Sequence, residues 1–394
     1  MIDRQPPARG LGLRLLVLIA AVAVVGSNQL ALSPILLDVA RSLSASPVAV
    51  SRAAACYGGA TALSALLLAP RIDRLGARRA LLAGLLALAA ATLASAAATG
   101  WLVLTLAQGL AGLGAGVILP SSYTLATAVG PPGQGARTLG RVLTGWSLSM
   151  VAGVPLSALI SDWAGWRAAY LALALVAGLA ALGARAMPRD RAAPGLARAA
   201  AAPLAALAEP AMPPLLLICL AYMAGFFGVY TFLGDHVRAM AGVSAARAGL
   251  VVLAYGGGFG LASLGGGLVD RLGPRRVFPA VLLSAAAIYL ALAATGGGLA
   301  PVAALTFLWG LANHFVLACL ILLITQARPQ ARGAALGLNS AVTYLGALVG
   351  VSAAGAIYQA IGFAALCCTA AALMAAAAGL AVASRQRLAG PPAG

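Results

Sequence analysis

The chain has 394 residues, of which 62% are hydrophobic and only 8% are charged, and its mean hydropathy is +0.99. Soluble domains carry about 25% charged residues, so water cannot be the main solvent of this protein. The formal net charge of +17 would favour nucleic-acid binding in a soluble chain, but here the Arg residues separate apolar segments, so we expect no nucleic-acid partner.

The predicted elements are apolar segments of about 20 residues, the length with which an α-helix crosses a lipid bilayer. In chain order they are 13–37, 48–68, 80–98, 101–127, 142–160, 168–187, 214–236, 246–269, 277–295, 299–325, 333–358 and 363–383. The first segment is too long for the apolar core of a signal peptide, and further spans follow it at once. The sequence therefore predicts an all-α membrane protein with twelve transmembrane helices in the lipid bilayer.

Basic residues are unevenly distributed among the predicted loops. If the N-terminus is cytoplasmic, all but five of the 25 basic residues, every one an Arg, fall on the cytoplasmic side. The five on the outer side are Arg41, Arg52, Arg167, Arg238 and Arg247. Because cytoplasmic loops of membrane proteins are enriched in Lys and Arg, both termini are expected in the cytoplasm of a multi-pass protein of the bacterial inner membrane.

An internal repeat divides the chain. Residues 69–79 read A-P-R-I-D-R-L-G-A-R-R, and residues 266–276 read G-G-L-V-D-R-L-G-P-R-R, at an offset of 197 residues. The same offset relates Asp38 to Asp235 and Gly153 to Gly350. A parallel repeat of this kind predicts two six-helix bundles, 1–187 and 214–394, joined by a cytoplasmic linker, 188–213. A pseudo-twofold axis along the membrane normal would relate the bundles and place a substrate site between them.

The D-R-x-G-x-R-R loop, present twice, resembles the signature loop of the major facilitator superfamily, and the likeness covers nearly the whole chain. Segments 108–112, 148–156 and 165–167 resemble the drug and sugar efflux branch, whose twelve-helix members are drug:proton antiporters. The resemblance implies the major facilitator fold and proton-coupled export. Two positions depart from the branch: Thr105 stands where its pattern has an Arg, and Val154 separates a Gly and a Pro that are adjacent in antiporters.

The repeated loop is implied by the resemblance to be a cytoplasmic latch that stabilises the outward-open state, the alternative being a solvated turn. Its members are Asp73, Arg74, Gly76, Arg78, Arg79, Asp270, Arg271, Gly273, Arg275 and Arg276. A second set, of small residues and one Pro, permits close approach of helices. These positions form either the interface that rocks during transport or ordinary helix packing with no bearing on transport direction. The set comprises Gly145, Gly153, Pro155, Gly346 and Gly350.

Ionisable residues inside the predicted spans are few, and each costs about 2.5–3.5 kcal/mol at a helix centre. Asp38 and Asp235 lie at outer span ends, with His236 beside the second, and His314 lies near a span centre. The two acids are interpreted as an outer gate with nearby Arg residues, or as proton carriers. His314 either couples protons or is a neutral imidazole in the protein core.

The substrate cavity implied by the resemblance is lined mainly by the first, fourth, seventh and tenth spans. Its expected residues are Asn28, Gln29, Gln108, Trp146, Tyr222, Phe226, Tyr230, Trp309, Asn313 and His314, although helix-packing positions use the same residue types. Amides and aromatic rings without a central charge favour a neutral or weakly amphipathic organic solute.

The sequence therefore predicts a monomeric secondary transporter that moves a small-molecule substrate by alternating access, with proton-coupled efflux as the favoured mode. Facilitated diffusion, a non-transporting membrane sensor and a soft-metal (copper) importer remain open as alternatives. The metal alternative depends on His236 and Met240, one helical turn apart. Catalytic motifs are missing from the sequence, so we expect no enzyme activity, no cofactor and no bound metal.

Overall fold

The structure is a computed structural model that describes residues 8–68, 75–130, 134–187, 207–262, 267–295, 298–327 and 332–385. These residues are almost entirely helical, and no strand occurs among them. The helices are α1 (Ala8–Leu30), α2 (Leu32–Ser42), α3 (Pro47–Leu67), α5 (Ala77–Ala96), α6 (Trp101–Val129), α7 (Gly135–Leu148), the π-helical η2 (Ser149–Gly153), α8 (Val154–Ala164), α9 (Trp166–Ala184), α10 (Met212–Ala241), α11 (Ala245–Ala262), α12 (Gly267–Leu272), α13 (Pro274–Ala293), α14 (Leu299–Ala327), α15 (Arg332–Ala360) and α16 (Phe363–Ala383).

Among the described residues, eleven helical stretches are long and apolar enough to cross a membrane. They correspond to every predicted span except the second, which is α3. This helix has 21 residues, which at about 1.5 Å per residue match the roughly 30 Å hydrocarbon core. Its hydropathy is lower because it carries Arg52 and many small residues.

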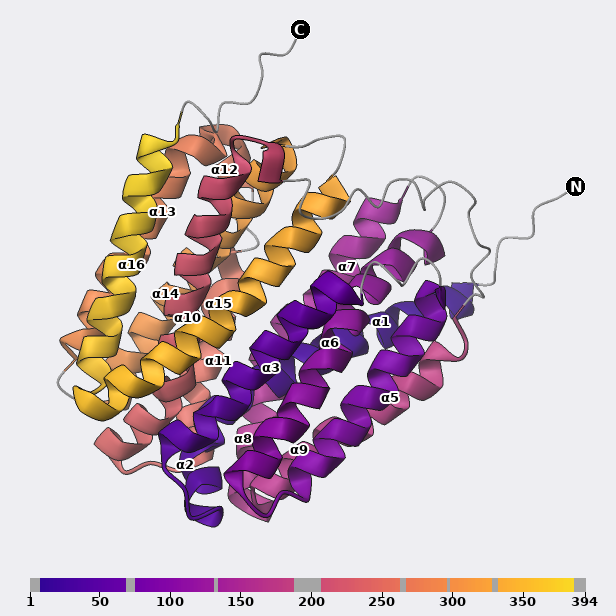
Figure 1. Cartoon of the computed structure of the whole chain (residues 1–394), viewed down its shortest axis with the longest axis horizontal. Coiled ribbons are helices and arrows are strands. Elements are labelled where there is room, and N and C mark those ends of the chain that lie inside the picture. Colours follow the sequence, from indigo (N-terminus) through magenta and orange to yellow (C-terminus); the bar gives the residue numbers. More distant parts are fainter. Residues whose placement is uncertain are drawn as a thin grey trace, which may run out of the picture.

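The helices gather into two groups, with α1 to α9 on one side of the molecule and α10 to α16 on the other (Figure 1). At the boundary α3 packs against α15, and α8 packs against α11. The first contact is close because Gly58 has no side chain: a Cβ there would lie 2.7 Å from the Cβ of Ala347. The α3–α15 contact between the two groups is therefore made by small residues in the middle of two long helices.

The sequence repeat is reproduced in the backbone. The helices α5 and α13 begin 197 residues apart, and each follows a glycine with positive φ, Gly76 (88°) and Gly273 (82°). Gly165 (84°) and Gly362 (102°) form a second such pair, before α9 and α16. Side-chain-bearing residues rarely adopt this conformation, so the repeat preserves a backbone requirement at both turns.

The predicted packing glycines lie within each half rather than between the halves. A Cβ at Gly153 would overlap Ser27 Oγ, and one at Gly350 would overlap the carbonyl oxygen of Ala224. These two contacts are related by the same offset of 197 residues. A Cβ at Gly145 would lie 2.6 Å from the carbonyl oxygen of Ile19, on α1.

Two predicted spans are interrupted by proline. The first span was expected to be continuous, but it divides at Ala31 into α1 and α2. Pro34 lacks an N–H and cannot bond the carbonyl of Leu30, so the helix breaks there. Likewise, Pro155 cannot bond the carbonyl of Val151, which lies in the π-helical segment η2 between α7 and α8.

Candidate functional site

Hydrogen bonds join the two halves at the end of the molecule where α2 lies, opposite α12 (Figure 1). We call this contact between α2 and α8 on one side and α10 and α11 on the other the α2 seam. Ser33 Oγ donates to the carbonyl of Tyr230, a residue 197 positions later. Because the pair is related by the repeat offset, the pseudo-twofold axis passes beside this contact.

Close backbone packing supports the α2 seam. A Cβ at Gly234 would overlap the carbonyl oxygen of Ser33 and lie 2.7 Å from Pro34 Cα. No side chain fits at position 234 unless α2 and α10 move apart. Glycine is therefore required there while the seam is closed.

An ion pair crosses the α2 seam. The Arg238 guanidinium donates from Nη1 to Asp38 Oδ2 and from Nη2 to Oδ1, both over 2.7 Å. Nη1 also donates to the carbonyl of Pro34 over 3.3 Å. The Arg238 side chain is 9% exposed and that of Asp38 is 29% exposed, so the pair is only partly screened by solvent.

The repeat-related pair is not formed. Arg41 is exposed, and Asp235 accepts a hydrogen bond of 2.6 Å from the hydroxyl of Tyr358 in its own half. The sequence interpretation treated Asp38 and Asp235 alike, whereas the structure gives them different partners.

A second carboxylate in the α2 seam, Asp162, was missed by the sequence analysis. Its Oδ1 and Oδ2 accept the backbone N–H groups of Ala245 and Ala246, both over 2.9 Å, at the first turn of α11. These N–H groups have no partner inside the helix, and the helix dipole favours an anion there. The sequence shows only that Asp162 is an acid near the end of the fifth predicted span. Its partners are backbone N–H groups 83 and 84 positions away, so the sequence did not reveal them.

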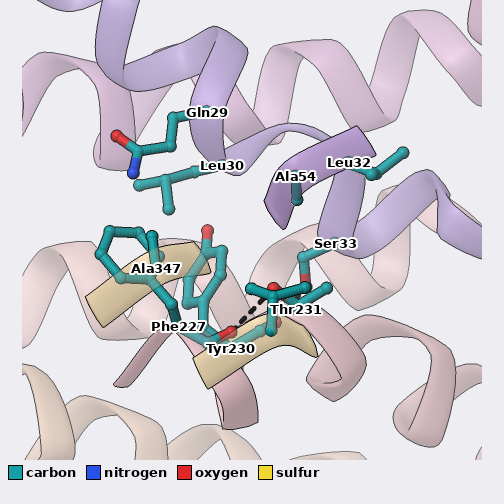
Figure 2. Close-up of a pocket in the computed structure, with 10 residues that line it drawn as sticks. Gln29, Leu30, Leu32, Ser33, Ala54, Phe227, Tyr230, Thr231 and Ala347 are labelled. Carbon is teal, nitrogen blue, oxygen red and sulfur yellow. Dashed lines mark hydrogen bonds between the residues drawn. The ribbon is translucent and has the colours of Figure 1, made fainter. Parts of the chain in front are cut away.

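A narrow pocket lies beside the α2 seam and receives residues from both halves (Figure 2). Gln29 contributes from α1 and Tyr230 from α10, and the rest of the lining is mostly apolar. Both are buried, with 7% and 1% of their surface exposed. Among the described residues, neither polar atom of the Gln29 amide nor the Tyr230 hydroxyl has a hydrogen-bond partner.

The other amides predicted to line the cavity are held within one half. Asn28 Nδ2 donates to Gln108 Oε1, and Gln108 Nε2 donates to Ser95 Oγ, both over 2.9 Å. This chain connects α1, α6 and α5. In the other half, Asn313 Nδ2 donates to the Tyr255 hydroxyl over 3.0 Å.

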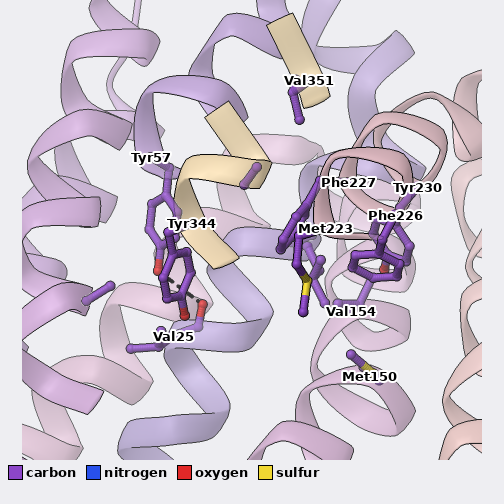
Figure 3. Close-up of a cluster of buried hydrophobic side chains, with 14 of the residues drawn as sticks. Val25, Tyr57, Met150, Val154, Met223, Phe226, Phe227, Tyr230, Tyr344 and Val351 are labelled. Carbon is purple, nitrogen blue, oxygen red and sulfur yellow. Dashed lines mark hydrogen bonds between the residues drawn. The ribbon is translucent and has the colours of Figure 1, made fainter. Parts of the chain in front are cut away.

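Aromatic side chains fill the centre of the C-terminal half. Phe226 lies 5.4 Å from both Tyr230 and Trp309 and 5.7 Å from Tyr255, measured between ring centroids. Tyr222 donates to the carbonyl of Asn313, over 3.4 Å. Figure 3 shows Phe226 and Tyr230 together on α10, within a cluster of buried side chains to which Tyr57 and Val25 of the other half also belong. Of the predicted cavity residues on α10, Tyr230 lines the pocket.

Three further predicted residues lie outside the pocket lining. Trp146 donates to the hydroxyl of Tyr123 over 3.1 Å. His314 lies edge-on to Phe259, and its Nδ1 has no partner among the described residues. His236 stacks on Phe363 with ring centroids 4.1 Å apart. In the part of the chain that the structure describes, no group of three or more potential metal ligands gathers.

The predicted cytoplasmic latch is described only in part. Asp73, Arg74 and the Asp270 side chain lie outside the described residues. Arg78 donates to the carbonyl of Arg185 over 2.6 Å at the end of α9, and Arg79 is exposed. A shallow surface pocket is lined by Arg271, Leu272, Gly273, Pro274, Arg275, Arg276 and Gln326.

The fold and the α2 seam define a polytopic helical membrane protein whose repeated halves meet about an axis. The family model of the Major Facilitator Superfamily matches residues 17–330 and, in a second match, 241–393. This chain therefore belongs to the Major Facilitator Superfamily of transporters.

Several relatives agree with this assignment, and a solved structure shares the fold. The chain is 27% identical over 357 residues to the uncharacterized MFS-type transporter YwfA of Bacillus subtilis, covering 89% of this chain and 87% of YwfA. It is 30% identical over 266 residues to a chloramphenicol resistance protein of Streptomyces lividans, covering 66% and 67%. It is 25% identical over 308 residues to a probable sugar efflux transporter of Mannheimia succiniciproducens, covering 77% and 75%. The inward-facing, unoccupied structure of a bacterial homolog of the human lysosomal transporter Spinster superposes with a TM-score of 0.72, at 16% identity, over 97% of both chains.

Proposed function

We propose that this protein is a secondary transporter that exports a small uncharged or weakly amphipathic organic solute in exchange for protons. The observation that carries the proposal is the α2 seam, where polar contacts hold the two halves together beside the repeat axis. Hydrogen bonds and one ion pair can break and re-form, as alternating access requires. Chloramphenicol resistance and sugar efflux in the names of two relatives favour export of uncharged molecules.

The proposed topology follows the sequence interpretation. Counting α3, twelve helices span the membrane in two bundles, 1–187 and 214–394, joined by the linker 188–213. Both termini lie in the cytoplasm of a bacterium, and the α2 seam faces outward as the outer gate. The protein acts as a monomer and has no catalytic residue of its own.

Facilitated diffusion is a second candidate, favoured by Thr105. Its hydroxyl donates to the carbonyl of Trp101 in the same helix, over 2.8 Å, where the antiporter pattern has an Arg. Threonine carries no charge. It therefore cannot take the part in proton coupling that the Arg of the antiporter pattern takes.

Flux measurements in proteoliposomes test the proposal, with radiolabelled chloramphenicol and an uncharged sugar as solutes. Saturable, protein-dependent flux is expected, and an imposed pH gradient is expected to drive accumulation of the solute against its concentration gradient. Flux that is unchanged by the imposed pH gradient would favour facilitated diffusion. Binding without flux would identify a sensor, and no flux with either solute would contradict transport of this substrate class.

A further inference from the structure

An open pocket lies at the end of the molecule opposite the α2 seam, where α12 is found (Figure 1). It has a volume of about 410 Å³ and lies where α12 ends, α13 begins and α14 ends. We call it the arginine pocket, because Arg271, Arg275 and Arg276 line it together with Gln326. Since α13 and α14 are both long and apolar enough to cross a membrane, their ends here lie at the level of the lipid headgroups.

The arginines of this pocket are not used in holding the protein together. No hydrogen bond or ion pair engages the guanidinium groups of Arg271, Arg275 or Arg276 within the part of the chain that the structure describes. Asp270 precedes Arg271, but its side chain lies outside the described residues. A single carboxylate neutralises at most one of three guanidinium groups, so the pocket keeps a positive charge.

The sequence repeat shows what is particular to this copy of the loop. In the N-terminal copy, Arg78 occupies the position of Arg275 and donates to the carbonyl of Arg185. The position of Gln326 is held there by Val129, which is buried in the hydrophobic core. The C-terminal copy thus has an amide in place of an apolar packing residue, and its arginine lacks the bond to a neighbouring helix. Both differences fall in the arginine pocket.

An apolar face of α13 leads from the pocket into the membrane. Arg276, Leu283 and Leu290 are all exposed and are spaced by seven residues, so they share one face of the helix. Leu283 lies about 10 Å along the helix axis from Arg276, within one leaflet of a hydrocarbon core about 30 Å thick. Leu272, which also lines the pocket, is exposed as well. A molecule with an anionic head and apolar chains matches both features, whereas a free anion would use only the arginines.

We propose that the arginine pocket binds the phosphate group of an anionic phospholipid, whose acyl chains lie along the Leu283 face of α13. Guanidinium groups bind phosphate oxygens through paired hydrogen bonds, and the Gln326 amide donates one more. A zwitterionic headgroup fits less well, because its ammonium group would lie among cationic side chains. The site is separate from the α2 seam and stands whether or not the proposed solute is transported.

Native mass spectrometry of the purified full-length protein, titrated with one lipid at a time, tests the proposal. The lipids are dioleoyl phosphatidylglycerol and dioleoyl phosphatidylcholine, which share their acyl chains and differ in headgroup charge. Inorganic phosphate is added as a competitor, to distinguish a lipid from a free anion.

The variants separate the pocket from the general surface charge. They are Arg276→Gln, the double variant Arg275→Gln/Arg276→Gln, and Gln326→Val, which introduces the residue of the N-terminal copy without changing the charge. The control is Arg79→Gln, which removes an exposed charge at the position equivalent to Arg276. Without lipid, all of them should melt like the native protein, because these side chains have no partner among the described residues.

The first phosphatidylglycerol is expected to bind about tenfold more tightly than the first phosphatidylcholine. Its affinity should fall about fivefold in Arg276→Gln, about twentyfold in the double variant and about threefold in Gln326→Val, and should be unchanged in Arg79→Gln. Equal affinity for the two lipids overturns the proposal, and so do equal losses in Arg276→Gln and Arg79→Gln. Displacement of phosphatidylglycerol by an equal concentration of inorganic phosphate would show that the ligand is a free anion and not a lipid.

Discussion

At the residue scale, two acids of the N-terminal half hold the C-terminal half. Asp38 binds the side chain of Arg238, whereas Asp162 binds backbone N–H groups at the start of α11. Hydrogen bonds to charged groups contribute about 1.5–3 kcal/mol, and partial exposure of Asp38 places the ion pair near the lower end. Contacts of this size can hold a gate and still break during each transport cycle.

Arg238→Ala is expected to shift the population from the closed to the open α2 seam by about tenfold, because it leaves Asp38 without its partner. Distances between spin labels at Ser44→Cys and Ala241→Cys, in a background with the native cysteines replaced, report the two states. Arg247→Ala removes an exposed charge at the same end and serves as the control. Equal label distances in both variants and the native protein would show that the ion pair has no role in closure.

Asp162→Ala should open the same seam, because the first turn of α11 loses its acceptor. The expected cost is about 1 kcal/mol, typical of a lost helix cap, with Asp162→Asn intermediate. The matched control is Ser46→Ala, since Ser46 accepts the N–H of Ala49 over 3.1 Å and caps α3 within its own half. Both changes should lower the melting temperature, but only those at Asp162 should increase the distance between the labelled halves.

At the scale of single elements, the helix interruptions have a common cause in proline. Pro34 and Pro155 each remove one backbone hydrogen bond. Near Pro34 the helix breaks between α1 and α2, and near Pro155 a π-helical turn precedes α8. Both interruptions lie in elements that form the α2 seam. The two short segments α2 and α8 therefore make extensive contact with the other half, while α1 and α7 pack mainly within their own.

Gly234→Ala tests the packing of α2 against α10. The new Cβ meets the Ser33 carbonyl, so the variant should favour an open seam at a cost of about 1–3 kcal/mol. Gly178→Ala is the matched control, because a Cβ at that helical position meets nothing within 4 Å. The control should keep or slightly raise the melting temperature. Similar behaviour of the two variants, measured by melting temperature and label distance, would argue against tight packing at Gly234.

At the scale of the whole molecule, the repeat relates the halves but their seam contacts are unequal. Ser33 and Tyr230 occupy equivalent positions and bond each other, whereas Asp38 and Asp235 have different partners. The duplicated backbone thus supplies the symmetric frame, and divergence of the side chains supplies the unequal contacts of the α2 seam.

Alternating access predicts that the α2 seam must open in every cycle. A cleavable thiol crosslinker between Ser44→Cys and Ala241→Cys should stop chloramphenicol flux, and reduction should restore it. The control joins Ala241→Cys to Ile361→Cys, two exposed positions in one half, and should leave flux unchanged. Continued flux with the seam crosslinked would contradict its role as a gate.

The sequence predicted the superfamily and the helical membrane fold because length, hydropathy and the repeated loop are local properties of the chain. It predicted a loop around Gly76 and another around Gly273 for the same reason, whereas the positive φ of each glycine comes from the structure. It missed the break at Ala31 because an apolar run shows no interruption in hydropathy, although Pro34 contained the cause. It did not identify Asp162, since backbone N–H groups of another helix leave no sequence pattern.

Side-chain partners explain the uneven prediction of the site. Amides and aromatic residues on membrane helices serve both as cavity lining and as packing, and only geometry separates the two uses. Gln108 is bonded within its half, whereas Gln29 lies at the boundary, and neither polar atom of its amide has a partner among the described residues. Residue type alone suggested which residues could line the cavity. The neighbours of each residue in the structure decide whether it lines a pocket or packs within one half.

The position of the repeat axis beside Ser33 and Tyr230 has a consequence for the orientation of a bound molecule. A pocket made of two identical copies would accept a molecule equally well in either of two orientations related by a half-turn. Here Leu30 faces its counterpart Phe227, and Ser33 faces Tyr230, so the copies no longer match. The two orientations are therefore no longer equivalent, and a molecule that bound there would be held in one of them.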